Sequence, residues 1–182
     1  MINKINEYLE NEVVRITFDK DMLEEYDKHH ALLHPRRKKK SLDFCGKKRT
    51  GMLPSLNVFL NVGSRIIQNE RKKAIADYTE FVLKKLDVDR NYLERCAIIV
   101  KQYHPTRSKF DPDNVHTKSS FDSMSEYGFW EDDNIYVVEP YIVTGGYDKD
   151  NPRTEFVIFP ITEEHSREFV LNCMIEELIK NT

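Results

Sequence analysis

The sequence predicts a single α+β domain in which a mixed β-sheet of about four strands packs with helices. The first observation is its length, since 182 residues suit one domain or a domain with a tail. The second is that short segments rich in β-branched residues are interspersed with segments whose apolar residues recur every three to four positions. The third is their order, strand-helix-helix-strand-helix-strand-strand-helix, which indicates one α+β domain.

The first half of the chain is expected to supply one strand and two helices. Glu12–Phe18 is rich in β-branched residues and predicts the first strand. Asp19 or Asp21 is expected to cap a helix that continues through Asp27–Leu33. In Ser64–Leu86 the apolar residues recur at helical spacing and the basic residues fall mostly elsewhere, which predicts the longest helix.

The second half is expected to supply three strands and two helices. Ala97–Tyr103 is apolar and predicts a strand. Asn114–Tyr127 predicts a shorter helix, and Gly128 follows it where a left-handed cap is wanted. Two further strands and a closing helix are predicted over Ile135–Thr144, Arg153–Ile161 and Glu163–Lys180.

Charge is unevenly distributed, although the net charge is only −3. Between Pro35 and Thr50 the chain carries eight basic residues against one acid, whereas acids dominate from Asp111 to Glu139. This combination fits an enzyme that binds polyphosphate through its basic segment and a metal through its acidic segment. The alternative is that the basic segment is a solvated charge run that binds no ligand. The eight basic residues are Arg36, Arg37, Lys38, Lys39, Lys40, Lys47, Lys48 and Arg49.

The acidic segment contains the pattern Asp-Pro-Asp-Asn from Asp111 onward. The proline favours extended backbone at Asp111, and residues two apart in an extended chain project to the same side, so Asp113 is expected beside it. Asp132 or Asp133 would supply a third carboxylate, and the sequence does not say which. Clustered carboxylates repel one another unless a cation is bound, and oxygen ligands favour Mg²⁺ or Mn²⁺. Such a site activates water for phosphodiester hydrolysis.

A polar stripe follows on the predicted helix, because Asn114, Lys118 and Asp122 are spaced four apart. Lys118 would then lie one turn above Asp113, where its ammonium could meet a phosphate or an activated water. Asp122 is expected to hold the lysine by an ion pair. The alternative is that Asp113 is a helix cap and the ion pair is an ordinary solvated one.

The run from Asp111 to Asn134 is similar to the core motif of RusA-like Holliday-junction resolvases, many of which are carried by phages and prophages. The resemblance extends over residues 13–161. Here the lysine lies four residues after the asparagine rather than three, and Ser123-Met124 stands where the family has Gly-Leu. The motif positions are filled by Asp111, Asp113, Asn114, Lys118, Asp122, Gly128, Asp132 and Asp133.

The resemblance implies a RusA-like nuclease core over residues 51–182, with residues 1–50 packed on it or flexibly joined. It implies a homodimeric endodeoxyribonuclease that makes paired symmetric nicks in four-way junctions with Mg²⁺, or Mn²⁺ as substitute, in DNA recombination and repair. The essential groups would be Asp111, Asp113, Lys118 and one of Asp132 and Asp133, with Asp133 favoured. A flap or fork endonuclease and a non-cleaving junction-binding module are the alternatives.

Other residues are expected to contact the DNA. The basic segment would neutralise phosphates, and Arg107 and Lys109, directly before the motif, would lie beside the scissile phosphate. Phe129 and Trp130 are expected either to stack on bases or to pack in the core. His116 is expected at the surface.

The remaining expectations concern cofactors and location. The chain has no Gly-rich phosphate loop, so no nucleotide cofactor is expected. It has neither an apolar run of roughly 20 residues nor a signal-peptide pattern, so we expect a cytoplasmic protein of a bacterium or phage-infected cell without a membrane partner. The scattered thiols of Cys45, Cys96 and Cys173 are expected to be idle.

Overall fold

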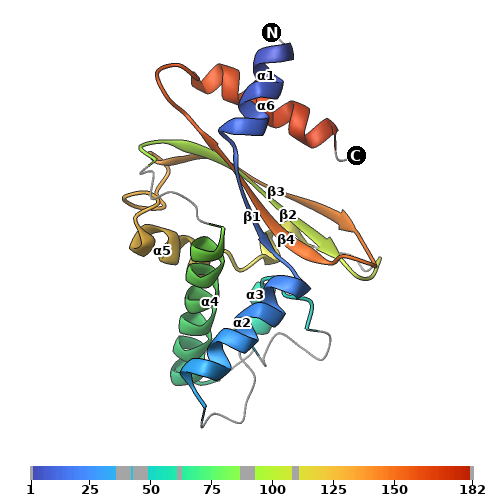
Figure 1. The fold of residues 1–182 in the computed structure, drawn as a ribbon, viewed down its shortest axis with the longest axis vertical. Helices are drawn as coiled ribbons and strands as arrows, with labels where there is room; N and C mark the ends of the chain where they lie inside the picture. The colour runs from blue at the N-terminus through green and yellow to red at the C-terminus, as the bar shows by residue number, and fades with distance from the viewer. Residues whose placement is uncertain are drawn as a thin grey trace.

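The computed structural model describes residues 2–35, 42, 49–60, 63–86, 93–107 and 111–180, without the side chains of Ile2 and Asp113. A four-stranded mixed sheet runs through the middle of the molecule, and helices cover both of its faces (Figure 1). The predicted fold class is therefore confirmed. The strands are β1 (Val14–Phe18), β2 (Cys96–His104), β3 (Val138–Tyr147) and β4 (Arg153–Pro160). The helices are α1 (Ile2–Asn11), α2 (Lys20–Leu33), α3 (Leu56–Leu60), α4 (Arg65–Lys85), α5 (Lys118–Tyr127) and α6 (Arg167–Ile179), with a 3₁₀ turn, η2 (Pro112–Asn114).

The sheet has the strand order β1-β4-β2-β3. β4 pairs antiparallel with both β1 and β2, whereas β3 lies parallel to β2 at one edge. β2 is central and is buried on both faces from Cys96 to Gln102. A strand covered on both faces can carry a continuous apolar run, which is why Ala97–Val100 shows no alternation.

Two apolar cores lie on opposite faces of this sheet. Ile98 and Val100 pack in the core with α2, α4 and α5, whereas Ala97 and Ile99 pack in the core with α1 and α6. Successive strand residues point to opposite faces, so the single apolar run of β2 serves both cores. Figure 1 shows α1 and α6 together on one side of the sheet and the other helices on the other side.

α1 was not predicted from the sequence. Its apolar side chains Ile5, Tyr8 and Leu9 are buried against the sheet and α6. The Tyr8 hydroxyl donates a hydrogen bond to the carbonyl oxygen of Pro160 at 2.6 Å. Burial is the leading cause that raises the pKa of Tyr8, so the hydroxyl stays protonated and can donate this bond.

Two local signals are confirmed. The Asp19 carboxylate accepts a hydrogen bond from the Met22 amide at 2.8 Å and caps α2. Gly128 ends α5 in the left-handed region, with φ of 86°. Both signals depend on a few adjacent residues, so they act regardless of what packs nearby.

Three predicted boundaries are wrong. The helix predicted from Asn114 begins at Lys118, and the strand predicted from Ile135 begins at Val138. The last helix begins at Arg167 rather than in the region of Glu163, with the Ser166 hydroxyl accepting from the Phe169 amide at 3.4 Å. Thr162 instead stabilises the preceding turn by accepting from the His165 amide at 3.1 Å.

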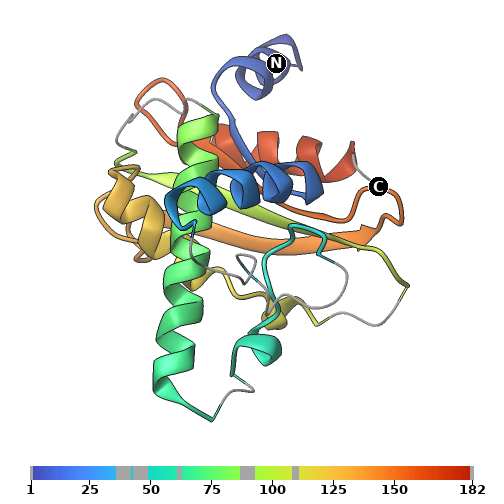
Figure 2. The ribbon, with the colours of Figure 1, turned by 60° about the horizontal axis from the view of Figure 1, so that its bottom comes forward.

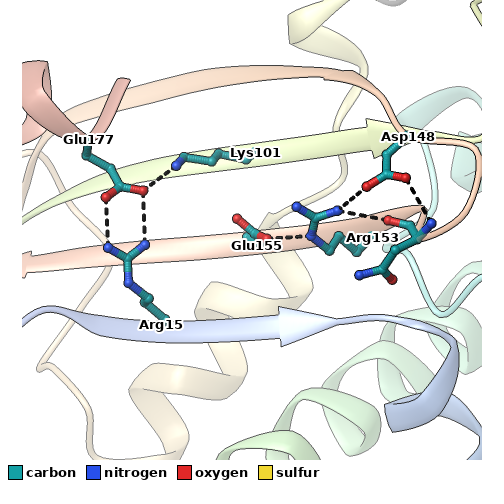
Figure 3. A network of polar contacts seen from close by, with 7 residues as sticks. Arg15, Lys101, Asp148, Arg153, Glu155 and Glu177 are labelled. Atoms are coloured by element: carbon teal, nitrogen blue, oxygen red, sulfur yellow. Dashed lines mark hydrogen bonds and ion pairs between the residues drawn. The ribbon is translucent and has the colours of Figure 1, made fainter. Parts of the chain in front are cut away.

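Buried ionic groups attach α6 to the sheet (Figure 3). The Glu177 carboxylate accepts two hydrogen bonds from Arg15, at 3.0 and 2.8 Å, and also pairs with the Lys101 ammonium. Burial alone would raise the pKa of Glu177, but the hydrogen bonds from Arg15 and Lys101 outweigh it and hold the pKa at about 2. Glu177 is therefore ionised, and it compensates a lysine that is only 1% exposed.

Two further findings bear on the expectations from sequence. No helix in the described ranges is both long enough and apolar enough to cross a membrane. Cys96 and Cys173 are free buried thiols, and burial raises the pKa of Cys96 to about 12, so neither reactivity nor a disulfide is indicated for it. Cys45 lies outside the described residues.

Candidate functional site

The acidic motif follows β2 and begins in extended backbone. Asp111 is exposed and has φ of −94° and ψ of 119°, as expected for a residue before proline. The backbone does not remain extended, because Pro112–Asn114 form the 3₁₀ turn η2. The extended backbone expected across Asp111–Asp113 therefore does not continue beyond Asp111. The side chain of Asp113 lies outside the described residues.

The residues after η2 are tied to the start of α3. Val115 forms an isolated antiparallel bridge with Ser55, and the next amide donates to the carbonyl oxygen of Pro54 at 3.3 Å. The side-chain oxygen of Asn114 accepts from the Asn57 amide at 3.0 Å. These long-range bonds hold residues 114–116 outside the helix. Asn114 consequently serves the amino-terminal end of α3 and does not share a helical stripe with Lys118.

His116 is buried, contrary to the expectation of a surface histidine. It is 5% exposed, and its ring stacks on Phe59 with a centroid distance of 4.1 Å and an interplanar angle of 8°. Its Nε2 lies 2.8 Å from the hydroxyl oxygen of Ser119. Burial lowers the pKa of His116, and the positive charges of Lys72 and Lys118 act in the same direction. A neutral imidazole therefore joins α3 to the first turn of α5.

Lys118 is the first residue of α5 and is exposed. Its ammonium pairs with the Asp122 carboxylate at 3.0 Å, which confirms the predicted pair. The hydrogen bond and charge of Asp122 raise the pKa of Lys118, with smaller contributions from Asp133 and Asp132. The loop between α5 and β3 therefore lies close to the start of α5, although Lys118 comes well before it in the chain.

In that loop Asp132 and Asp133 lie against one another. One oxygen of the Asp132 carboxylate accepts from the Asp133 amide at 2.9 Å, and the other accepts from the Asn134 side chain at 3.1 Å. The bond from Asn134 is the largest cause that lowers the pKa of Asp132, followed by the Asp133 amide. The charge of Lys118 lowers the pKa of Asp132 further. Asp132 is thus an oriented, ionised carboxylate.

The carboxylates of this loop are the type of ligand that binds divalent cations. Hard carboxylate oxygens are the donors that Mg²⁺ and Mn²⁺ prefer, and a cation would relieve the repulsion between Asp132 and Asp133. Within the described ranges, no three His, Cys, Asp or Glu side chains stand together as a metal-binding group. The charges of Asp132 and Asp133 act on Lys118 in this structure. Asp111 is not among the described carboxylates that raise the pKa of Lys118.

The predicted DNA-binding residues are placed in part. The Arg49 guanidinium forms two hydrogen bonds with the Asp27 carboxylate, at 2.7 and 3.1 Å, which ties it to α2. The Arg107 guanidinium lies over the Tyr147 ring, 5.0 Å from its centroid. The other predicted residues lie outside the described part of the chain: Arg36, Arg37, Lys38, Lys39, Lys40, Lys47, Lys48 and Lys109.

Lys72 was not singled out from the sequence. In the sequence it belongs to the solvated face of a helix, yet its charge acts on His116 of the motif. The amino-terminal half of α4 extends past the sheet beside α3 (Figure 2). Arg71 connects these two helices by donating to the Val58 carbonyl oxygen at 2.6 Å. The basic run 71–73 was the available signal, but only helix packing reveals its proximity to the motif.

The aromatic residues beside the acidic pair are also placed. Phe129 and Trp130 are both buried in the core, with ring centroids 5.3 Å apart in an edge-to-face arrangement, so the core alternative holds. The aromatic side chain exposed in this loop is instead Tyr136, next to an exposed Ile135. Both were assigned to a strand from sequence, and the structure places them in the turn before it.

Comparison with known proteins returns no family model and no curated protein that matches this chain. Support for a function therefore comes from the motif and its geometry.

Proposed function

We propose that this chain is a Mg²⁺-dependent, structure-selective DNA endonuclease that resolves four-way junctions by paired nicks, as RusA-like enzymes do. The observation that carries the proposal is that the charges of Asp132 and Asp133 act on the ammonium of Lys118. These residues come from the first turn of α5 and from the loop after it. An ammonium on which paired carboxylates act suits chemistry on a phosphodiester, where negative charge develops near a bound metal.

Each group has a distinct task in this proposal. Asp111, Asp113, Asp132 and Asp133 are the residues that would hold the metal, which supplies a polarised water and positive charge to the phosphate. Asp132 is available as an anion because its hydrogen bonds lower its pKa. Lys118, oriented by Asp122, neutralises charge on the phosphate or the leaving oxygen. Neutral His116 maintains the position of the motif relative to α5.

DNA binding would extend beyond these groups. Lys72, Arg107, Lys109 and the basic segment 36–49 would neutralise backbone phosphates, which gives affinity without reading sequence. Two coordinated nicks require two active sites, so we propose a homodimer with twofold symmetry. The cell compartment that fits this activity is the cytoplasm of a bacterium or a phage-infected cell.

The test is cleavage of a synthetic four-way junction by purified protein, with and without Mg²⁺, beside a linear duplex, a flap and a fork. Metal-dependent symmetric nicks that spare the duplex are expected. Asp113→Asn and Asp133→Asn should abolish them, whereas Asp150→Asn, an exposed acid in the β3–β4 turn, should have no effect. Faster cleavage of a flap or a fork than of the four-way junction would indicate that the flap or the fork is the substrate. Equal cleavage by all three variants would contradict the proposal.

A junction-binding module without cleavage is the second candidate. It is favoured by the hydrogen bonds within the loop, which already occupy both oxygens of Asp132. Metal dependence separates the candidates, because the module predicts tight junction binding without nicks at any Mg²⁺ concentration.

A further inference from the structure

A pair of hydroxyl groups joins the beginning of α5 to β3. The Tyr141 hydroxyl lies 3.2 Å from the hydroxyl oxygen of Thr117, and either group can donate the hydrogen bond. Thr117 directly precedes Lys118 and is the N-cap residue of α5. Its carbonyl oxygen accepts from the amides of Ser120 and Phe121 at 2.9 and 3.0 Å, so this residue begins the first turn of the helix. Tyr141 is therefore attached to the turn to which Lys118 belongs.

The two hydroxyls close a segment of the chain that contains the candidate site. Residues 117–141 run through α5, the loop after it and the beginning of β3. This segment carries Lys118 and also Asp132 and Asp133, whose charges act on it. The contact between Thr117 and Tyr141 therefore links the helix that holds the ammonium with the strand that follows the acidic pair.

The Tyr141 ring is held in place independently of its hydroxyl. It packs edge-to-face on Phe121 of α5, with a centroid distance of 5.8 Å and an interplanar angle of 83°. Phe121 in turn packs edge-to-face on the buried Trp130, with a centroid distance of 5.7 Å. The Tyr141 backbone lies in the paired part of β3, opposite Ile98 of β2. Packing of the ring and pairing of the strand thus leave the hydroxyl little conformational freedom to lose.

The first turn of α5 is also held from its other side, by His116. The His116 Nε2 lies 2.8 Å from the Ser119 hydroxyl, and the His116 ring stacks on Phe59 of α3. The two attachments differ in burial, because His116 and Ser119 are buried whereas Tyr141 is 42% exposed. A hydrogen bond at a partly exposed position replaces bonds to water and gives little net stability. The bond between Thr117 and Tyr141 therefore fixes a position more than it stabilises the fold.

We propose that Tyr141 is a positioning residue of the candidate site, which acts through Thr117 to hold Lys118 where it meets the scissile phosphate. This inference rests on the proposed endonuclease function and assigns part of its rate to one further residue. Burial raises the pKa of Tyr141 and outweighs the opposing effect of the bond to Thr117, so the phenol stays protonated at neutral pH and can donate. A displaced ammonium neutralises less of the charge that develops in the reaction, and a displacement of about 1 Å can cost up to about 100-fold in rate.

The test begins with Tyr141→Phe, which removes only the hydroxyl, and Thr117→Val, which removes its partner and keeps a similar shape. The control is Tyr136→Phe, the same chemical change at a tyrosine that is 80% exposed. Lys118→Met is measured alone and in combination with Tyr141→Phe. Nicking of a synthetic four-way junction is followed in Mg²⁺ under single-turnover conditions at saturating protein. Junction affinity is measured in Ca²⁺, and urea unfolding gives the midpoint of each variant.

Tyr141→Phe and Thr117→Val should each slow nicking about tenfold, while junction affinity and the unfolding midpoint stay as in the wild type. Because the effect passes through Lys118, adding Tyr141→Phe to Lys118→Met should slow nicking no further. A merely structural role would lower the rate in both backgrounds. Tyr136→Phe should nick at the wild-type rate.

Wild-type nicking by Tyr141→Phe would overturn the positioning role and leave the endonuclease intact. A further tenfold loss in the Lys118→Met background would also overturn it, since the hydroxyl would then act independently of the ammonium. A slower rate accompanied by a lowered unfolding midpoint would overturn it in favour of a general structural role. A wild-type protein that nicks no junction would overturn both proposals.

Discussion

The side-chain oxygen of Asn114 accepts a hydrogen bond from the backbone amide of Asn57 at 3.0 Å, so the acidic motif caps a helix far from it in the chain. Asn57 is the second residue of α3, where an amide has no partner within the helix. The asparagine of the motif therefore has a structural task that can be separated from metal binding.

Asn114→Ala should lower the free energy of unfolding by about 1 kcal/mol, because the α3 amide loses its capping acceptor. Urea unfolding measures this change. Nicking should fall as well, since η2 is no longer tied to α3. The exposed Asn69 of α4 supplies the control, and Asn69→Ala should change neither quantity. An unchanged unfolding midpoint in Asn114→Ala would show that the bond contributes nothing.

Lys118→Met should reduce the rate of nicking about 100-fold, because it removes the ammonium that neutralises charge on the phosphate. Junction affinity should change much less, so single-turnover cleavage at saturating enzyme separates the two effects. Lys149→Met, at an exposed lysine in the β3–β4 turn, is the control. If Lys118→Met lowers junction affinity but not the rate of nicking, Lys118 contributes to DNA binding rather than to the reaction.

Lys72→Ala should raise the pKa of His116, because the positive charge of Lys72 helps to lower it. NMR titration of the imidazole measures this shift directly. The same change should reduce the slope of log affinity for DNA against log salt by about one unit. Lys73→Ala is the matched control and should leave the pKa of His116 unchanged, since Lys73 is not among the charges that act on this imidazole. The same pKa of His116 in both variants would show that Lys72 does not act on the motif.

Glu177→Gln should destabilise the protein by about 3 kcal/mol, since it leaves the buried ammonium of Lys101 without an opposite charge. Arg15 is half exposed and can regain water, so it contributes less. The double variant Lys101→Met, Glu177→Gln should recover part of the loss, because the uncompensated charge is gone. Chemical unfolding of the three proteins measures these values, and additive losses in the double variant would contradict the coupling.

Protonation of the Glu177 carboxylate should lower the stability of the wild-type protein in acid. The pKa of Glu177 is lowered from its ordinary value of 4.5 to about 2 in the folded protein. A carboxylate with a lowered folded pKa contributes its full stability above its unfolded pKa and loses it as the pH falls towards the folded value. The free energy of unfolding should therefore decrease between about pH 5 and pH 2, and Glu177→Gln should show a flatter profile over that range. Parallel profiles would contradict this account.

Signals contained in a few adjacent residues could be predicted from the sequence. The Asp19 cap, the left-handed Gly128 and the Lys118–Asp122 pair each depend on groups at most four residues apart. The apolar run of β2 and the helical spacing of α4 were equally visible, because burial imposes periodicity along the chain itself. Together these signals determined the fold class, its four strands and the neighbourhood of the acidic motif.

The tertiary structure alone decided the arrangement of the candidate site. Helical spacing from Asn114 onward was overridden by the Val115–Ser55 bridge and by the stacking of His116 on Phe59. The effect of the acidic pair on Lys118, and the exposure of Tyr136, likewise depend on how α5 and its following loop pack. Hydrogen bonds and burial between segments distant in sequence exceed the small differences in local propensity, and a single sequence does not encode those partners in its local pattern.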